Sequence, residues 1–162
     1  MSSKIARRRA REFALQGIYQ FLLSGNSARM IESHFETVSG FDKVDRELFI
    51  ELLRGVVAER TALEARFAPF LSRGIQELSP VEHAVLLMAT QELLNRIETP
   101  YRVVINEAIE LAKTYGGTDG HRFVNGVLDR LAAQLRPEEV AARRETQNKP
   151  AADDASPADA DA

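Results

Sequence analysis

The chain has 162 residues, a formal net charge of -3, 44% hydrophobic residues and no cysteine. The absence of cysteine excludes disulfide frameworks, thiolate nucleophiles and cysteine-ligated zinc, and it is typical of a reducing compartment, so we expect a cytoplasmic protein. No run of about 18 apolar residues exists that could span a membrane.

Charge is distributed unevenly along the chain. Residues 137–162 contain three basic and seven acidic residues, a net charge of -4, whereas residues 1–136 carry a net charge of +1. Alanine, aspartate, proline and glutamate dominate the acidic segment, which has too little apolar surface to offset the entropy lost on ordering it. We therefore predict a folded domain over residues 1–136 and a disordered acidic tail over residues 137–162.

Hydrophobic residues recur at helical spacing through the first half of the chain. Residues 8–24 predict a helix that ends at a G-N-S turn, and a shorter helix is predicted over residues 28–38. A longer helix follows over residues 45–60 and could extend to Pro69. Gly55 within it costs about 1 kcal/mol relative to alanine, so we expect another helix to approach closely there.

The second half begins with the clearest helix start in the sequence. In S-P-V-E, residues 79–82, serine suits the N-cap, proline the first turn, and glutamate completes a capping box. This helix is predicted to run to about Arg96. Two more helices are predicted, one ending at Y-G-G, residues 115–117, and one starting near Thr118 or Asp119. No segment has the alternating pattern of a strand, so the predicted fold is all-α.

Residues that could carry catalysis do not form a recognisable site. His34, His83 and His121 are far apart and lack the spacing of metal ligands, and no phosphate-loop or nucleophile-elbow glycine motif occurs. Glu107 and Glu110 lie three apart on a predicted helix, where glutamates are usually part of a solvated face. We therefore predict a protein that is not an enzyme and needs no metal or other cofactor.

The most distinctive feature is the stretch K-I-A-R-R-R-A-R, residues 4–11, with five cations in eight residues. On a helical wheel at about 100° per residue, Arg9 points away from the other four, which share one arc of about 100°: Lys4, Arg7, Arg8 and Arg11. That arc coincides with the apolar stripe of the same helix. We therefore expect Arg11 to be partly buried and paired with a carboxylate, and the others to form a cationic arm above the core.

Three interpretations of this arm remain open from the residues alone. It could bind a nucleic acid, bind another acidic partner, or be an ordinary solvated helix end. Cations at a helix N-terminus oppose the helix dipole by about 0.3 kcal/mol or more each. An anionic partner would explain why the sequence accepts that cost, and phosphate groups are the anions that clustered arginines favour.

A second group of residues surrounds the glycine-rich loop before the last predicted helix. It combines cations and aromatic side chains: Lys113, Tyr115, His121, Arg122 and Phe123. Helix N-termini bind phosphate, and aromatic faces stack on unpaired bases. Phe123 also fits the core stripe of its own helix, and Asp119 would repel a phosphate. Both a binding role and a purely structural role therefore stay open for this group.

Five blocks of the sequence, taken in order, resemble one known family. They are A-R-R-R-A-R-E-F-A-L-Q-G-I-Y-Q, L-L-R-G-V, S-P-V-E-H-A-V-L-L-M-A-T-Q-E-L, P-Y-R-V-V-I-N-E-A-I-E-L-A-K-T-Y-G and H-R-F-V-N-G-V-L-D-R-L. From about Lys4 to Leu135 the chain is similar to the NusB family of bacterial transcription antitermination factors. The resemblance implies about seven helices in two packed three-helix-type subdomains, over about residues 4–78 and 79–136.

The resemblance also implies a function. NusB-family proteins pair with a small-subunit ribosomal protein that acts as NusE, and together they bind the single-stranded boxA element of nascent RNA. This complex joins NusA, NusG and RNA polymerase to suppress termination, notably in rRNA operons. The candidate RNA-binding residues are therefore Lys4, Arg7, Arg8, Arg9, Arg11, Lys113, Tyr115, His121, Arg122 and Phe123.

Other matching positions imply contacts with the protein partner. Tyr19 and Glu82 match positions that the family uses toward the ribosomal protein, and Gln76 stands where some members carry an acidic partner-facing residue. Asp119 matches an acid near the RNA or partner surface. Two alternatives remain: a NusB-like helical module for rRNA processing or modification, as precedes some RNA methyltransferase domains, and a self-associating protein, since some members form homodimers.

Overall fold

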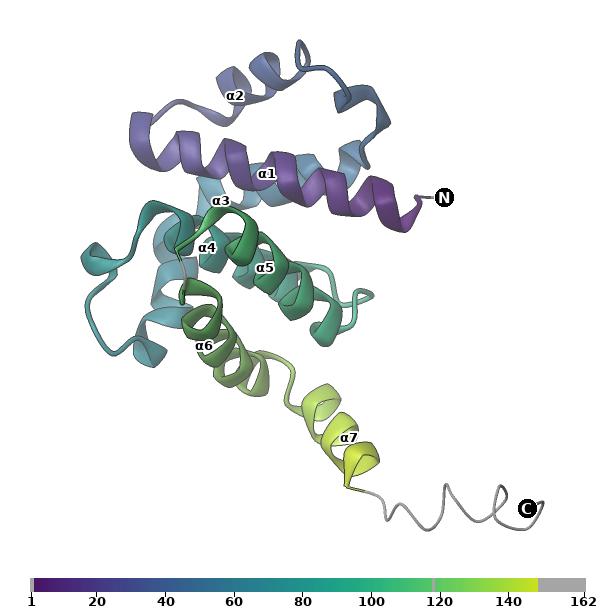
Figure 1. Ribbon diagram of the computed structural model, residues 1–162, viewed down its shortest axis with the longest axis vertical. Coiled ribbons are helices and arrows are strands. Elements are labelled where there is room, and N and C mark those ends of the chain that lie inside the picture. Colours follow the sequence, from purple (N-terminus) through teal and green to yellow (C-terminus); the bar gives the residue numbers. More distant parts are fainter. Residues whose placement is uncertain (1, 118, 149–162) are drawn as a thin grey trace, which may run out of the picture.

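The structure, a computed structural model, describes residues 2–117 and 119–148. This part of the chain is built from α-helices and three short 3-10 turns, without strands, so the predicted all-α fold of about seven helices is confirmed. The helices are α1 (Lys4–Ser24), α2 (Ala28–Phe35), α3 (Arg46–Phe67), α4 (Pro80–Asn95), α5 (Tyr101–Tyr115), α6 (Gly120–Leu135) and α7 (Pro137–Gln147) (Figure 1).

Helix α1 starts four residues earlier than predicted and ends where predicted. Ser3 is its N-cap, and the Ser3 hydroxyl accepts a hydrogen bond from the Ala6 backbone N–H at 3.0 Å. Gly25 ends the helix with φ 74°, a left-handed conformation that glycine adopts without the steric cost of a Cβ. The basic stretch is therefore helical throughout, which fixes the direction in which each cation points.

The predicted capping box is present at the start of α4. The Ser79 hydroxyl accepts a hydrogen bond from the Glu82 N–H, the Glu82 carboxylate accepts one from the Ser79 N–H, and both distances are 3.1 Å. Every residue from His83 to Leu93 is buried. A helix that is buried on all sides lies at the centre of a fold, and α4 packs against α1, α3, α5 and α6.

Helix α3 extends through Phe67, the longer of the two predicted ends, with a local departure from helical geometry at Glu59. The close approach predicted at Gly55 is confirmed, because a Cβ added there would lie 2.0 Å from Gln91 Nε2 of α4. A single hydrophobic core runs through α1 to α6 and reaches Val140 of α7. The division into subdomains over residues 4–78 and 79–136 stays a prediction.

The prediction of disorder is wrong for residues 137–147, which form α7. Val140 is buried, and the Glu139 carboxylate accepts hydrogen bonds from the Tyr101 backbone N–H at 2.7 Å and from Arg136 Nη1 at 3.0 Å. These contacts hold α7 against the N-terminus of α5 and the end of α6. The rest of the predicted tail, residues 149–162, lies outside the described residues.

Candidate nucleic-acid interface

Helices α1 and α5 lie side by side and run in the same direction (Figure 1). Arg8 of α1 contacts Glu107 of α5, and further along Tyr19 of α1 lines one groove with Tyr115 of α5. Between the first half of α1 and α5 is a cleft of about 570 Å³, whose lining includes Lys4, Arg8, Asn106, Glu107 and Glu110. Lys4 and Arg8, two of the cations predicted to bind RNA, thus line a cleft and do not simply project from an isolated helix end.

Arg8 is held by a carboxylate from the opposite wall of this cleft. Its Nε and Nη2 donate to the two carboxylate oxygens of Glu107, each at 2.9 Å. The Arg8 side chain is 52% exposed and that of Glu107 only 11%. The expectation that Glu107 belongs to a solvated face is therefore wrong, because in the folded protein this glutamate pairs with Arg8 and lies close to Arg11.

The hydrogen bonds from Arg8 lower the pKa of Glu107 below its ordinary value, although burial of the carboxyl acts in the opposite direction. The positive charges of Arg11 and Lys4 contribute to the same lowering. Glu107 therefore stays ionised at neutral pH. A carboxylate anion therefore lies against the cationic arm in this structure.

Arg11 is part of the protein interior, as the helical wheel predicts. Its side chain is 4% exposed, and its Nε and Nη2 donate to the Glu92 carboxylate at 3.0 and 2.6 Å. Arg11 Nη1 also lies 3.8 Å from Glu107 Oε1. Because the guanidinium is buried and paired, Arg11 has a structural role in this conformation, and its assignment to RNA binding stays a prediction.

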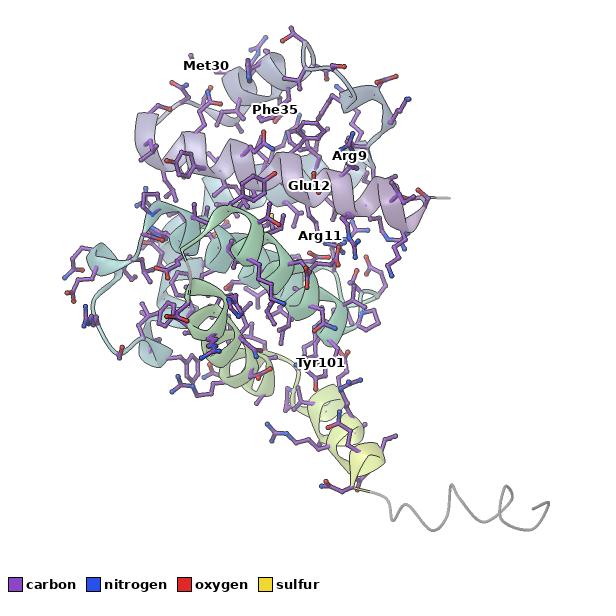
Figure 2. The ribbon with its side chains drawn as sticks, in the orientation of Figure 1. Arg9, Arg11, Glu12, Met30, Phe35 and Tyr101 are labelled. Atoms are coloured by element: carbon purple, nitrogen blue, oxygen red, sulfur yellow. The ribbon has the colours of Figure 1, made fainter. Side chains whose placement is uncertain are left out.

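The other cations of the arm point in different directions. Among the described residues, Lys4, Arg7 and Arg9 have no carboxylate within ion-pair distance, and Arg7 Nη1 donates to the Ser2 carbonyl at 2.6 Å. Arg9 Nη2 would lie 3.5 Å from a Cβ on Gly40, on the side of the connection between α2 and α3. Figure 2 shows Arg9 and Arg11 on opposite sides of α1, so Arg9 faces away from the cleft.

Tyr19 and Tyr115 lie together although one is predicted to contact protein and the other RNA. They line a groove of about 280 Å³ with Leu15, Gln16 and Val81. The two tyrosine side chains stay partly exposed, at 39% and 42%. Exposed tyrosines over an apolar floor are well suited to recognition, since each offers a large rigid face and a polar hydroxyl.

The residues around the N-terminus of α6 form a different site from the one expected. Phe123 packs partly against the core and lines a pocket of about 310 Å³ with Leu71, Leu78 and Glu82. A Cβ on Gly120 would lie 3.2 Å from Glu82 Oε2, so this carboxylate lies close to the first turn of α6. An acidic group there would repel a phosphate, so the phosphate site considered at this helix N-terminus finds no support.

The remaining candidates are dispersed over the surface. Lys113 pairs with Glu110 at 3.6 Å, His121 is half-buried, and Arg122 is exposed. Gln76 is exposed and lines a separate pocket of about 390 Å³ with Leu22, Leu23 and His83. Asp119 is exposed at the N-cap position of α6, and its side chain makes no capping hydrogen bond.

No group of three or more potential metal-ligating side chains gathers within residues 2–117 and 119–148. None of the described helices has both the length and the apolarity needed to cross a membrane.

Comparisons with known proteins identify the family of this chain. Residues 8–133 match the NusB family. Over 144 residues the chain is 70% identical to "Transcription antitermination protein NusB" of Aromatoleum aromaticum, covering 89% of this chain and 99% of that protein. The protein of the same name from an Azoarcus species is 67% identical over 145 residues, covering 89% and 94%. The solved structure of NusB from T. maritima superposes with a TM-score of 0.72 at 30% identity, covering 86% of this chain and 98% of that one.

Proposed function

Since the chain belongs to the NusB family, we propose that it is a non-enzymatic transcription antitermination factor that binds boxA-type single-stranded RNA. In this proposal it binds RNA together with a small-subunit ribosomal protein acting as NusE. The complex joins NusA, NusG and RNA polymerase in the cytoplasm and promotes read-through of terminators, notably in rRNA operons.

The observation that carries the RNA-binding part is the position of the cations at the start of α1. Lys4 and Arg8 line the cleft between α1 and α5, and Arg7 lies between them on the same helix. Among the described residues, neither Lys4 nor Arg7 forms an ion pair with a carboxylate. Phosphate binding by such cations is salt-dependent and largely independent of sequence.

The small number of free cations supports a requirement for a protein partner. Arg8 is paired with Glu107, and Arg11 is buried against Glu92, so only part of the five-cation stretch is available to phosphates. A few phosphate contacts give only modest affinity at physiological salt. A partner that adds its own contacts would supply the missing affinity and sequence preference.

The groove of Tyr19 and Tyr115 supports a partner site that adjoins the RNA site. It lies further along the same pair of helices as the cationic cleft. A protein seated on Tyr19 would therefore approach Tyr115 and the end of α5. RNA that follows α1 and α5 would contact both proteins at once.

A binding titration tests this proposal. Fluorescent boxA-like RNA is titrated with the full chain, with and without the ribosomal partner, and with a Lys4→Ala/Arg7→Ala variant. The matched control is Arg143→Ala/Arg144→Ala, which removes the same charge from exposed positions on α7. We expect the partner to tighten binding, the α1 variant to weaken it, and the α7 variant to leave it nearly unchanged.

The salt dependence gives a second measurement on the same samples. The slope of log K against log salt is negative, and each lost phosphate contact reduces its magnitude by about 0.7 for a single strand. The α1 variant should therefore lose about 1.4 units of slope if both cations contact phosphates. Equal affinity and slope for the two variants, or no effect of the partner, would refute the proposal.

A further inference from the structure

We propose that Glu107 competes with RNA phosphate for Arg8 and so limits the affinity of the α1–α5 cleft for RNA. The inference rests on the proposed RNA-binding function and adds a residue that regulates its strength. Glu107 is then a positioning residue that acts through Arg8, without touching the RNA.

The Arg8 guanidinium is already engaged by Glu107 in the geometry that a phosphate would use. Arginine recognises a phosphate best with two parallel N–H groups, in the way that it recognises a carboxylate. In this structure the Nε and Nη2 groups of Arg8 both donate to Glu107 at 2.9 Å. One bidentate face of the guanidinium, Nε with Nη2, is therefore already occupied. RNA must either displace Glu107 or use the remaining N–H groups, chiefly those of Nη1.

The ion-pair network around Arg8 is electrically neutral. Arg8 and Arg11 contact Glu107, and Arg11 also pairs with Glu92, so two cations and two anions form one connected set. Their formal charges cancel. Arg8 therefore adds no net positive charge to the cleft, even though half of its side chain is exposed.

Glu107 can be replaced without leaving a buried charge unpaired. Arg11 keeps its two hydrogen bonds to Glu92 when the Glu107 carboxylate is removed. Arg8 is 52% exposed and is solvated when it loses its partner. A Glu107→Gln substitution should therefore leave the fold intact and release Arg8 toward the cleft.

Glu110 provides a matched control on the same helix. It lines the same cleft, it is exposed, and its ion pair is with Lys113 at 3.6 Å rather than with Arg8. Glu110→Gln changes the charge of the cleft by the same amount as Glu107→Gln. Only the Glu107 variant, however, releases the Arg8 guanidinium.

The experiment measures binding of boxA-like RNA by the full chain over a series of KCl concentrations. Glu107→Gln, Glu110→Gln and Arg8→Ala are compared with the double variant Arg8→Ala/Glu107→Gln. We expect Glu107→Gln to tighten binding at least about threefold at about 50 mM KCl and to steepen the salt slope by about 0.7, the value of one additional phosphate contact. Glu110→Gln frees Lys113 rather than Arg8, so its effect on affinity does not depend on the Arg8 guanidinium. In the Arg8→Ala background, Glu107→Gln should no longer steepen the salt slope.

A measurement on the unmodified protein does not depend on how any Glu107 variant folds. The Arg8 Nε–H resonance in ¹⁵N NMR spectra is assigned by its loss in Arg8→Ala. We expect RNA to shift this resonance and to change its exchange rate with solvent as phosphate replaces Glu107. An Arg8 Nε–H resonance that stays unchanged in saturating RNA would overturn the inference.

The inference and the proposed function fail in different ways. If Lys4→Ala/Arg7→Ala weakens RNA binding but Glu107→Gln binds equally or more weakly than the unmodified chain, Glu107 does not compete for Arg8 and only the inference is overturned. If the unmodified chain binds boxA-like RNA neither alone nor with the ribosomal partner, both are overturned.

Discussion

Arg11 and Glu92 form an ion pair in the interior of the protein, with 2.6 Å between Arg11 Nη2 and Glu92 Oε2. Both side chains are almost fully buried, at 4% and 2% exposed. The pair joins the basic start of α1 to the central helix α4. Arg11 is therefore buried, unlike the other cations of the K-I-A-R-R-R-A-R stretch. Arg11 therefore fixes the arm to α4.

Replacing Arg11 alone should destabilise the protein strongly. Arg11→Met leaves the Glu92 carboxylate buried without its partner, which costs about 3–5 kcal/mol. The double variant Arg11→Met/Glu92→Leu replaces both charges with apolar groups and should recover most of that loss. Urea unfolding followed by circular dichroism measures both. Arg9→Met, at an exposed position of the same helix, is the control and should change stability by about 0.5 kcal/mol or less. A double variant as unstable as the single one would contradict the role assigned to the pair.

Tyr19→Ala should weaken binding of the ribosomal partner without affecting stability. Tyr19 is 39% exposed on the groove that it shares with Tyr115, so truncation removes contact area rather than core packing. A tyrosine at the centre of an interface contributes about 2 kcal/mol or more, which corresponds to a loss of at least about thirtyfold in affinity. Isothermal titration calorimetry with the purified partner measures the change.

Met30→Ala is the control for this experiment, because Met30 is an exposed apolar residue on α2, outside the tyrosine groove and outside the pocket lined by Gln76. It should leave partner affinity nearly unchanged. If both variants bind the partner as tightly as the unmodified chain, the groove is not the partner site.

The ion pair of Arg8 and Glu107 should make stability depend on pH in the acidic range. Arg8, Arg11 and Lys4 all face Glu107, and they lower its pKa in the folded protein below the ordinary value of 4.5. As the pH falls, the unfolded chain binds a proton at this carboxyl before the folded protein does. The stabilisation is therefore complete above about pH 5 and is lost as the pH falls through the folded pKa.

Glu107→Gln removes this titration and should flatten the fall of unfolding free energy between about pH 6 and about pH 3. Glu110→Gln serves as the control, and it should follow the unmodified chain. Part of the acid sensitivity should remain in every variant, because Arg54 similarly lowers the pKa of Glu32. Equal pH profiles for Glu107→Gln and the unmodified chain would show that the pair contributes nothing to folding.

Helix α7 should contribute to stability through Glu139. The Glu139 carboxylate accepts a hydrogen bond from the first N–H of α5, in the manner of an N-cap, and also pairs with Arg136. Glu139→Ala should therefore cost about 1 kcal/mol, a typical value for loss of a cap. Glu138→Ala, an exposed neighbour on the same helix, should have almost no effect. Thermal unfolding of both variants makes the comparison, and equal melting temperatures would mean that α7 is only loosely attached.

The sequence was sufficient for features that depend on local rules. The capping box at Ser79 and Glu82, the end of α1 at Gly25 and the close approach at Gly55 are all confirmed. The helical wheel also separated Arg11 from Arg9, because both periodicity and direction are fixed once the segment is helical. Most of these features are set by residues within a few turns of one another. The close approach at Gly55 also depends on α4, which the sequence did not identify as the facing helix.

Features that depend on packing between distant segments were not predictable in this way. In the sequence Glu107 looks like a solvated glutamate, but the fold places α5 across a cleft from α1, where Glu107 pairs with Arg8, 99 positions away in sequence. Composition predicted disorder from residue 137 onward, but a short helix needs only a few tertiary contacts, here Val140 and Glu139. The shared groove of Tyr19 and Tyr115 likewise follows from the alignment of two helices that are distant in sequence.

The central claim is that this chain promotes antitermination by bringing RNA and the ribosomal partner together. In vitro transcription through a terminator downstream of boxA tests it most directly, with NusA, NusG, the ribosomal partner and RNA polymerase present. We predict that the chain raises read-through on the boxA template, and that Lys4→Ala/Arg7→Ala lowers this gain while Arg143→Ala/Arg144→Ala preserves it. Equal read-through with and without the chain, or an equal gain on a template with scrambled boxA, would contradict the claim.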